Sequence, residues 1–250
     1  MSQYIPRLRM FAGPNGSGKS TIKEVINSEL LGIYINPDEI EKEIKKFDYL
    51  DFTHYEISTN EEEVLAFFRS STLLKNADML DDTEFLRVNE NKLDFFDVPV
   101  NSYFASVCAD FIRKKLLESR KSFTFETVMS SYDKIELLEL AQKLGYRTYL
   151  YFVATSDPII NISRVKNRVC FGGHNVPEGK IISRYYRSME NLSKAIKYSN
   201  RAYIFDNSNH SRTWIAEITD AKEIEIKTDK IPAWFNEYCL KSLVSNVITE

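Results

Sequence analysis

The sequence has few cysteines, no long apolar run and little net charge. Its three cysteines, Cys108, Cys170 and Cys239, are scattered and show no metal-site spacing, so we expect reduced and buried thiols. No apolar run approaches the length of a transmembrane helix, and residues 1–7 lack the apolar segment of a signal peptide. These absences argue against a membrane protein and a disulfide-stapled secreted one, and they predict a cytoplasmic location.

The formal net charge of −3 hides an uneven distribution. Residues 48–100 contain thirteen Asp or Glu and four Lys or Arg, whereas residues 164–201 contain nine Lys or Arg and two Glu. The acidic stretch argues against a polyanionic partner lying across it. The basic stretch is typical either of a segment that closes on phosphate or of a solvated helix face.

The stretch Gly13-Pro14-Asn15-Gly16-Ser17-Gly18-Lys19-Ser20-Thr21 matches the phosphate-loop pattern G-x-x-x-x-G-K-[ST] in full. An apolar run at 8–12 precedes it and a helical apolar pattern begins at Ile22. Such a loop turns consecutive backbone N–H groups inward on a phosphate. We expect Lys19 to reach the β- and γ-phosphates of ATP and the Ser20 hydroxyl to hold Mg²⁺. The predicted nucleotide contacts are Gly13, Asn15, Gly16, Ser17, Gly18, Lys19, Ser20 and Thr21.

Apolar strand patterns alternate with helical ones along most of the chain. This alternation predicts an α/β fold, a P-loop NTPase three-layer sandwich with a mainly parallel sheet, formed by residues 1–250 as a single domain. Residues 48–99 interrupt it and are predicted to be a mostly helical insertion. Strands are expected at 7–13, 32–36, 122–127, 147–153, 202–206, 213–218 and 223–227, and helices from Ile22 to about Leu30 and at 102–119, 132–144, 157–168, 179–198 and from Pro232.

Two carboxylates follow predicted strands, where parallel-sheet enzymes keep their chemistry. Asp38 comes after strand 32–36 at the start of a helix, so it is a candidate catalytic base or a helix cap. Glu126 lies on strand 122–127, on the opposite face from Phe123 and Phe125. A carboxylate on a buried strand is costly unless it binds something, which favours a contact to a substrate hydroxyl or to Mg²⁺-bound water over a structural ion pair.

The basic stretch at 164–187 has the pattern of a lid. Arg164 and Arg168 share one helix face, Arg184 and Arg187 share another, and Gly172-Gly173 lies between them. On closure such arginines would clamp the charge of a transferring phosphoryl group. His174, in the same turn, is interpreted equally well as a substrate contact or as a turn-stabilising residue.

The order of these motifs resembles the zeta toxin family of P-loop kinases, in its compact bacterial branch. The resemblance covers 5–47 and about 101–210, through GPNGSGKST, NPDEI, SFTFET, SRVKNRV, GGHNVP, ISRYYRSMENL and FDNS. It implies an ATP- and Mg²⁺-dependent kinase that phosphorylates UDP-N-acetylglucosamine, with an antitoxin protein as partner. It also implies roles for individual residues: catalysis for Asp38, Lys19, Arg168 and Arg184, acceptor contacts for Asp38, Glu126 and Thr127, a metal contact for Ser20, and a nucleotide contact for Asn207.

The match is less complete at the acceptor residues. Asp38 is followed by Glu39-Ile40-Glu41 in place of the family's Asp-x-Phe-Arg type motif, and Glu126-Thr127-Val128 stands in place of Glu-Gly-Thr. Two functions therefore stay open: a small-molecule kinase with a sugar nucleotide as favoured acceptor, and an ATP-binding regulatory or partner-binding protein. A polynucleotide kinase is disfavoured, because only residues 164–201 are basic enough to bind nucleic acid.

Overall fold

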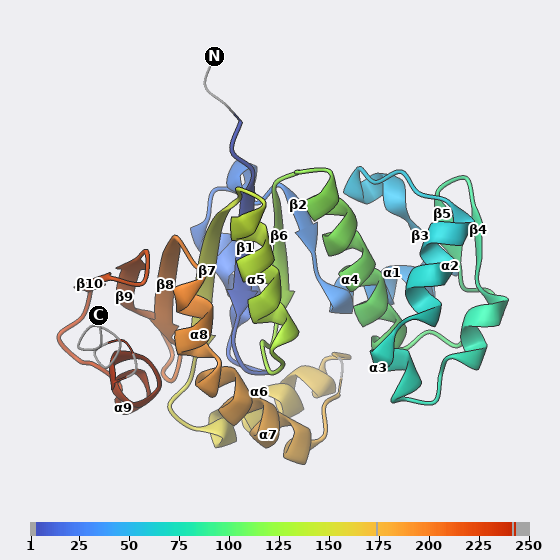
Figure 1. Cartoon of the computed structure of the whole chain (residues 1–250). Coiled ribbons are helices and arrows are strands. Elements are labelled where there is room, and N and C mark those ends of the chain that lie inside the picture. Colours follow the sequence, from blue (N-terminus) through green and yellow to red (C-terminus); the bar gives the residue numbers. More distant parts are fainter. Residues whose placement is uncertain (1–3, 174, 242, 244–250) are drawn as a thin grey trace. The chain divides into compact units, whose positions relative to one another are not determined.

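The computed structural model describes residues 4–173, 175–241 and 243. The chain divides into two compact units (Figure 1). The first unit comprises Met1–Gly32 and Thr124–Glu250, and the second comprises Ile33–Phe123.

The first unit is built on a sheet whose strands follow the order β10-β9-β8-β7-β1-β6. The pairs β1–β7 and β7–β8 run parallel, and β9 and β10 add an antiparallel edge. The predicted α/β class with a parallel central sheet is therefore confirmed. The strands are β1 (Arg7–Ala12), β6 (Phe123–Thr127), β7 (Arg147–Ala154), β8 (Arg201–Asp206), β9 (Thr213–Thr219) and β10 (Glu223–Ile226).

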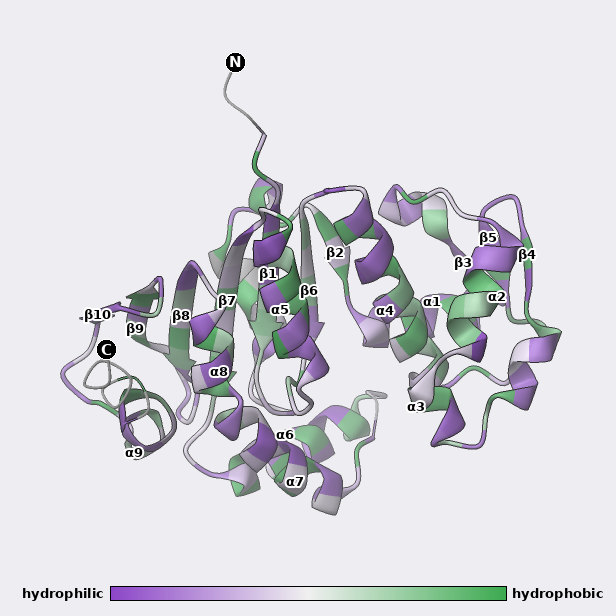
Figure 2. Ribbon diagram, in the orientation of Figure 1, coloured by the Kyte–Doolittle hydropathy of each residue, from purple (hydrophilic) through white to green (hydrophobic). Residues whose placement is uncertain are grey.

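Burial explains why these segments form strands. Leu150 and Phe152 on β7 are fully buried, as are Ala202 and Ile204 on β8. Figure 2 shows the apolar character of β8 and β9. Side chains of this kind fill the interior of a parallel sheet that is covered by helices. Helices α5 (Asp133–Lys143) and α8 (Leu192–Lys197) pack on β7 (Figure 1).

Two helical segments of the first unit differ from the prediction. The helix expected to reach Leu30 is two 3₁₀ helices, Lys19–Val25 and Ser28–Leu30. Ile26 between them is extended, and the Asn27 side chain accepts a hydrogen bond from the Glu29 amide at 3.0 Å. Asn side chains that bond nearby backbone compete with helix in this way. The helix expected at 179–198 is divided at Asn191 into α7 (Glu178–Glu190) and α8. The terminal helix begins at Ala233, directly after Pro232, as predicted; its described part includes α9 (Ala233–Phe235) and a π-helical turn, Asn236–Leu240.

The second unit begins with β2 (Ile33–Ile35) and α1 (Pro37–Phe47) and ends with α4 (Ser102–Glu118). Its buried core is rich in phenylalanine: Phe52 packs on Phe111 with ring centroids 5.3 Å apart, and Phe104 packs on Phe68 and Phe95. Between α1 and α4 lie β3 (Tyr49–Asp51), a 3₁₀ helix (Phe52–Tyr55), α2 (Glu61–Arg69), α3 (Thr72–Lys75), a 3₁₀ helix (Asp81–Phe85), β4 (Arg87–Asn89) and β5 (Lys92–Asp94).

The prediction that 48–99 is mostly helical is wrong: helices make up less than half of the segment, which also contains an antiparallel sheet of order β3-β5-β4. Each of these strands has three residues. Strands this short present no periodic pattern, which is why the sequence did not predict them.

Two of the three thiols are buried, as expected. Burial raises the pKa of Cys108 well above its ordinary value and that of Cys239 to about 12. Cys170, at the end of α6 (Pro158–Cys170), is exposed, contrary to the expectation of buried thiols, because a helix end beside a glycine turn offers nothing to cover it. In the described part of the chain no helix has the length and apolar character of a membrane span.

Candidate nucleotide-binding site

The loop between β1 and the 3₁₀ helix Lys19–Val25 needs its glycines. Gly13, Gly16 and Gly18 have φ angles of +142°, +75° and +95°, which other residues rarely adopt. A Cβ atom at Gly13 would lie 2.0 Å from the carbonyl oxygen of Val153. The loop therefore adopts a conformation that this sequence allows and most others would not.

Lys19 and Ser20 lie at the end of the loop. The Lys19 ammonium donates to the carbonyl oxygens of Gly13 and Pro14, at 2.8 and 2.9 Å. The Ser20 hydroxyl donates to Oε2 of Glu126, at 3.1 Å. Glu126 comes from the end of β6 and is 8% exposed. Folding therefore brings this carboxylate to the loop, next to the residue predicted to hold Mg²⁺.

Two buried polar atoms of the loop lack a partner. The Ser17 hydroxyl and Oδ1 of Asn15 form no hydrogen bond with any described residue, and Ser17 is fully buried. Buried polar atoms in folded proteins are nearly always bonded, so such orphans indicate a ligand or ordered water. The Ser17 hydroxyl, which can donate a hydrogen bond, fits a bound phosphate chain.

The segment after β8 closes on the loop. The Asn207 amide donates to the carbonyl oxygen of Ser17 at 2.8 Å, and it occupies the space that a Cβ atom at Gly18 would need. Arg212, from the same segment, donates to the Thr21 hydroxyl at 2.7 Å and lies over the Phe205 ring. Asn207, predicted to contact the nucleotide, thus contacts the loop, and its nucleotide contact stays a prediction. Arg212 was not predicted. No pattern in the sequence links residue 212 to residue 21; only the fold does.

Asp38 lies in the second unit, in the first turn of α1, and is exposed. The cap of this helix is Asn36, whose side chain accepts from the Asp38 amide at 2.9 Å. Asp38 is therefore not the cap of this helix, because Asn36 is the N-cap residue. The catalytic role of Asp38 stays a prediction.

Thr127 ends β6, and its hydroxyl accepts from the Met129 amide at 3.0 Å. This bond forms a tight local turn in which Met129 has a φ of +56°. The threonine hydroxyl thus stabilises the turn that follows Glu126. Its predicted acceptor contact stays untested.

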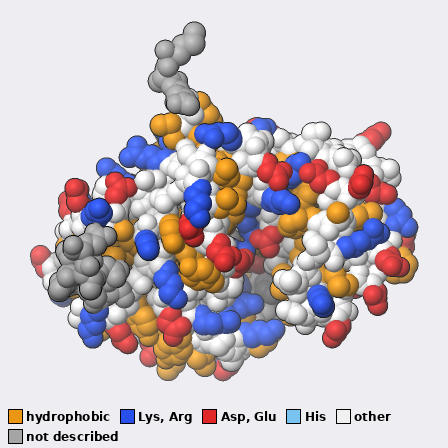
Figure 3. Space-filling model, in the orientation of Figure 1, with side chains coloured by type: hydrophobic (Ala, Val, Ile, Leu, Met, Phe, Trp, Pro, Cys, Tyr) orange, Lys and Arg blue, Asp and Glu red, His pale blue; other side chains and the backbone are white. Residues whose placement is uncertain are grey.

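Arg168 and Arg184 lie on α6 and α7, which form a helical hairpin with its own small core of Val165, Val176 and Ile181. A Cβ atom at Gly173 would lie 2.4 Å from Cγ of Arg168, so glycine keeps the turn tight against α6. Lys and Arg side chains gather over this hairpin (Figure 3). The hairpin is the segment predicted to act as a lid at 164–187; His174 lies outside the described residues.

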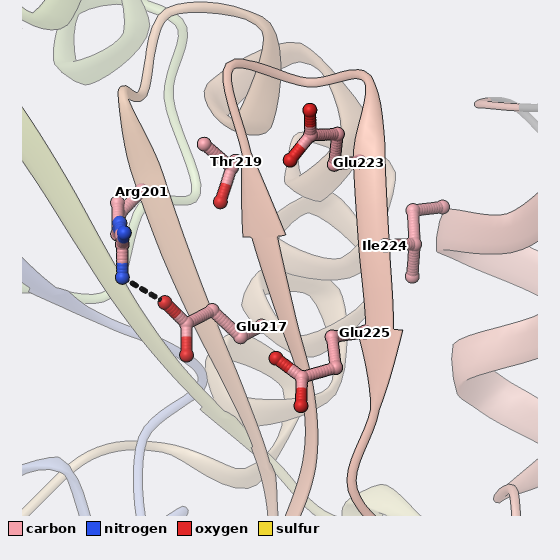
Figure 4. A pocket seen from close by; sticks show the side chains of 6 residues that line it. All are labelled: Arg201, Glu217, Thr219, Glu223, Ile224 and Glu225. Carbon is pink, nitrogen blue, oxygen red and sulfur yellow. Dashed lines mark hydrogen bonds and ion pairs between the residues drawn. The ribbon is translucent and has the colours of Figure 1, made fainter.

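A groove on the surface of β8, β9 and β10 also gathers charged side chains (Figure 4). Here Arg201 pairs with Glu217, and a hydrogen bond with Tyr203 together with this carboxylate raises the pKa of Arg201. Glu223 and Glu225 line the same groove. The charge of Arg201 is thus already neutralised by a neighbouring side chain, unlike the orphaned atoms of the phosphate loop.

Comparison with known proteins agrees with the motifs. The family model described as Zeta toxin matches residues 99–219. This span contains Glu126, Thr127, Arg168, Arg184 and Asn207. It includes neither the phosphate loop nor Asp38. The resemblance to zeta toxins is therefore confirmed by a part of the chain separate from the loop. No curated protein matches the sequence.

Solved structures share the fold. A chain of the AvrRxo1-ORF1:AvrRxo1-ORF2 complex with sulphate ions has a TM-score of 0.53 and 15% identity over 93% of this chain and 63% of that one. The same complex with ATP gives 0.52 and 16% over 89% and 61%. The PezAT chromosomal toxin–antitoxin system of Streptococcus pneumoniae gives 0.51 and 13% over 100% and 87%. Our chain therefore spans less than two thirds of the AvrRxo1-ORF1:AvrRxo1-ORF2 chains that it matches.

Proposed function

We propose that this chain is a kinase of the zeta toxin type, which binds ATP at Gly13–Thr21 and transfers the γ-phosphate to a hydroxyl group of an acceptor. The observation that carries the proposal is the phosphate loop itself. It combines three glycines in conformations with positive φ, the buried and unpartnered Ser17 hydroxyl, and the contact between Ser20 and Glu126. The zeta toxin match over 99–219 supports the kinase assignment.

The loop would neutralise the charge of the phosphate chain. Its backbone N–H groups and the Ser17 hydroxyl are hydrogen-bond donors, and Lys19 supplies a full positive charge. Ser20 and Glu126 offer oxygen atoms of the kind that Mg²⁺ prefers. Bound there, Mg²⁺ would neutralise charge on the β- and γ-phosphates.

The described residues include no group of three or more Asp, Glu, His or Cys side chains that could hold a metal ion. That agrees with Mg²⁺ in such enzymes, which commonly keeps several waters and takes only one or two protein ligands besides the phosphates.

The α6–α7 hairpin would complete the part of the site that holds the ATP phosphates. Phosphoryl transfer depends mainly on positioning and on stabilising charge, and a suitably placed arginine contributes strongly to the latter. Arg168 and Arg184 are the predicted contacts. Asn207 and Arg212 both contact the loop directly, so we assign them to the nucleotide as well.

Asp38 is proposed as the base that takes the proton of the acceptor hydroxyl. The test compares Asp38→Ala with Glu39→Ala, an exposed carboxylate at the next position of the same turn. Asp38→Ala should abolish phosphate transfer and leave ATP binding intact, whereas Glu39→Ala should retain transfer. Undiminished product formation by Asp38→Ala would remove the base assignment.

The acceptor is proposed to be UDP-N-acetylglucosamine or a related sugar nucleotide. A screen of acceptors with ATP and Mg²⁺, read by mass spectrometry, should give one phosphorylated sugar nucleotide. If ATP binds and no acceptor yields product, the chain is instead an ATP-binding regulatory or partner-binding protein. We further propose an antitoxin protein as partner and a cytoplasmic location. The similarity to a toxin–antitoxin system supports the former.

A further inference from the structure

Asn161 lies in the second turn of α6 and is fully buried. Its side-chain amide donates a hydrogen bond to the backbone carbonyl oxygen of Asn15 in the phosphate loop, with an N–O distance of 2.6 Å. A carbonyl oxygen only accepts, so the nitrogen of the amide must face the loop and its oxygen must face away. The hydroxyl of Thr155 donates to that oxygen. Both ends of the Asn161 side chain are therefore engaged.

Thr155 connects this contact to the other helix of the hairpin. It follows β7 directly and is fully buried. Its carbonyl oxygen accepts a hydrogen bond from the hydroxyl of Tyr185 on α7, at 2.6 Å. Burial raises the pKa of Tyr185, so this phenol remains a donor at any physiological pH. A continuous chain of hydrogen bonds thus runs from α7 through Thr155 and Asn161 to Asn15.

The backbone of the loop also rests on α6. A Cβ atom at Gly16 would lie 2.7 Å from the carbonyl oxygen of Asn161. Any residue other than glycine would force the loop away from the helix at this point. The loop is therefore seated on α6 by close backbone packing and held there by one fully buried amide.

We propose that Asn161 is a positioning residue that fixes the shape of the phosphate loop and couples it to the α6–α7 hairpin. What the loop binds rests on the proposed function; the coupling itself does not. The hairpin that carries Arg168 and Arg184 would then also set the conformation of Gly13–Thr21. Movement of α7 at Tyr185 would reach the loop through Thr155 and Asn161.

The first test is hydrogen exchange of the full chain, which needs no nucleotide. Asn161→Leu keeps the branching and the number of heavy atoms of the side chain and removes both hydrogen bonds. Amides of residues 13 and 15–21 should exchange about 10-fold faster or more, the effect of losing one buried hydrogen bond. Amides of β8 (Arg201–Asp206) should be unchanged. Unchanged exchange in the loop of Asn161→Leu would show that the hydrogen bonds of Asn161 do not hold the loop.

Thr155→Val and Thr155→Ser form the matched pair, and they carry the test should Asn161→Leu fail to fold. Valine removes the hydroxyl that orients Asn161, whereas serine keeps it. Exchange in the loop should rise in the valine variant and stay near that of the wild type in the serine variant. Equal exchange in the two variants would overturn the proposal.

ATP affinity of the same variants separates the two proposals. The dissociation constant should rise about 10-fold in Asn161→Leu, to a smaller extent in Thr155→Val, and little in Thr155→Ser. If the wild-type chain binds no ATP while exchange follows the expected order, the proposed function fails and the coupling stands. If ATP binds but exchange in the loop is the same in all variants, the coupling fails.

Discussion

The two units differ in where they leave buried polar atoms without a partner. In the described part of the chain four such side-chain atoms occur, and all of them belong to the first unit. Two lie in the phosphate loop, on Asn15 and Ser17, and two lie in the α6–α7 hairpin, on Arg164 and Ser188. An unsatisfied buried polar group costs free energy, so a folded protein rarely keeps one without a ligand or water to satisfy it.

In the second unit, polar side chains form hydrogen bonds with other groups of the same unit. Asn91 donates to the carbonyl oxygen of Ile57 at 2.6 Å and accepts from the amide of Thr59 at 2.9 Å. Lys115 donates to Glu63 at 2.7 Å. These contacts and the phenylalanine core stabilise the unit itself. The unit that contains the phosphate loop thus holds all four unpartnered atoms, whereas these contacts of the second unit stabilise that unit.

The largest effect should come from the phenylalanine core. Phe104 is fully buried between Phe68 and Phe95, so Phe104→Ala should lower the free energy of unfolding by about 3–5 kcal/mol through loss of burial and formation of a cavity. Urea unfolding measures this loss. At low urea, where the variant is folded, its ATP dissociation constant should match that of the wild type. A large loss of ATP affinity would show that the core of the second unit also determines nucleotide binding, contrary to our description.

A smaller effect is expected at the loop. Asn207→Ala removes the donor to the Ser17 carbonyl oxygen and should raise the ATP dissociation constant about 10-fold, with little change in stability. Asn209→Ala, two residues along the same segment, is the control, since its backbone carbonyl and not its side chain accepts from Arg164. Equal ATP affinities of the two variants would show that the Asn207 side chain does not contribute to nucleotide binding.

The smallest effect concerns pH. The hydrogen bond from Lys115 lowers the pKa of Glu63 below its ordinary value of 4.5, although burial opposes the shift. As the pH falls, Glu63 is therefore protonated in the unfolded chain before it is protonated in the folded one. The stabilisation is present above the ordinary pKa of 4.5 and is lost as the pH falls through the lowered pKa of the folded state.

Because the Glu63 side chain is 39% exposed, water screens its ion pair with Lys115. The pair therefore contributes about 0.5 kcal/mol to the free energy of unfolding. Lys115→Met should therefore lose less stability than the wild type between about pH 5 and pH 3. Parallel curves of unfolding free energy against pH would contradict the assignment.

The sequence identified the phosphate loop and the strand before it because their signals are local. Glycines in a phosphate loop and a lysine and serine at fixed spacing are readable without the fold, and alternation along β6 correctly set Glu126 apart from the buried Phe123 and Phe125. Asn161 and Arg212 could not be predicted in this way. Their partners are 146 and 191 residues away in the chain, and asparagine on a helix carries no pattern of its own.

The central claim is that Gly13–Thr21 binds a nucleoside triphosphate, and calorimetric titration with ATP and Mg²⁺ tests it most directly. Lys19→Ala should weaken binding about 100-fold, because it removes the full positive charge at the loop. Lys222→Ala, which removes an exposed charge at the turn between β9 and β10, should bind as the wild type does. Saturable binding by the wild type and Lys222→Ala, with loss in Lys19→Ala, is the predicted result. No binding by the wild type, or equal binding by Lys19→Ala, would contradict it.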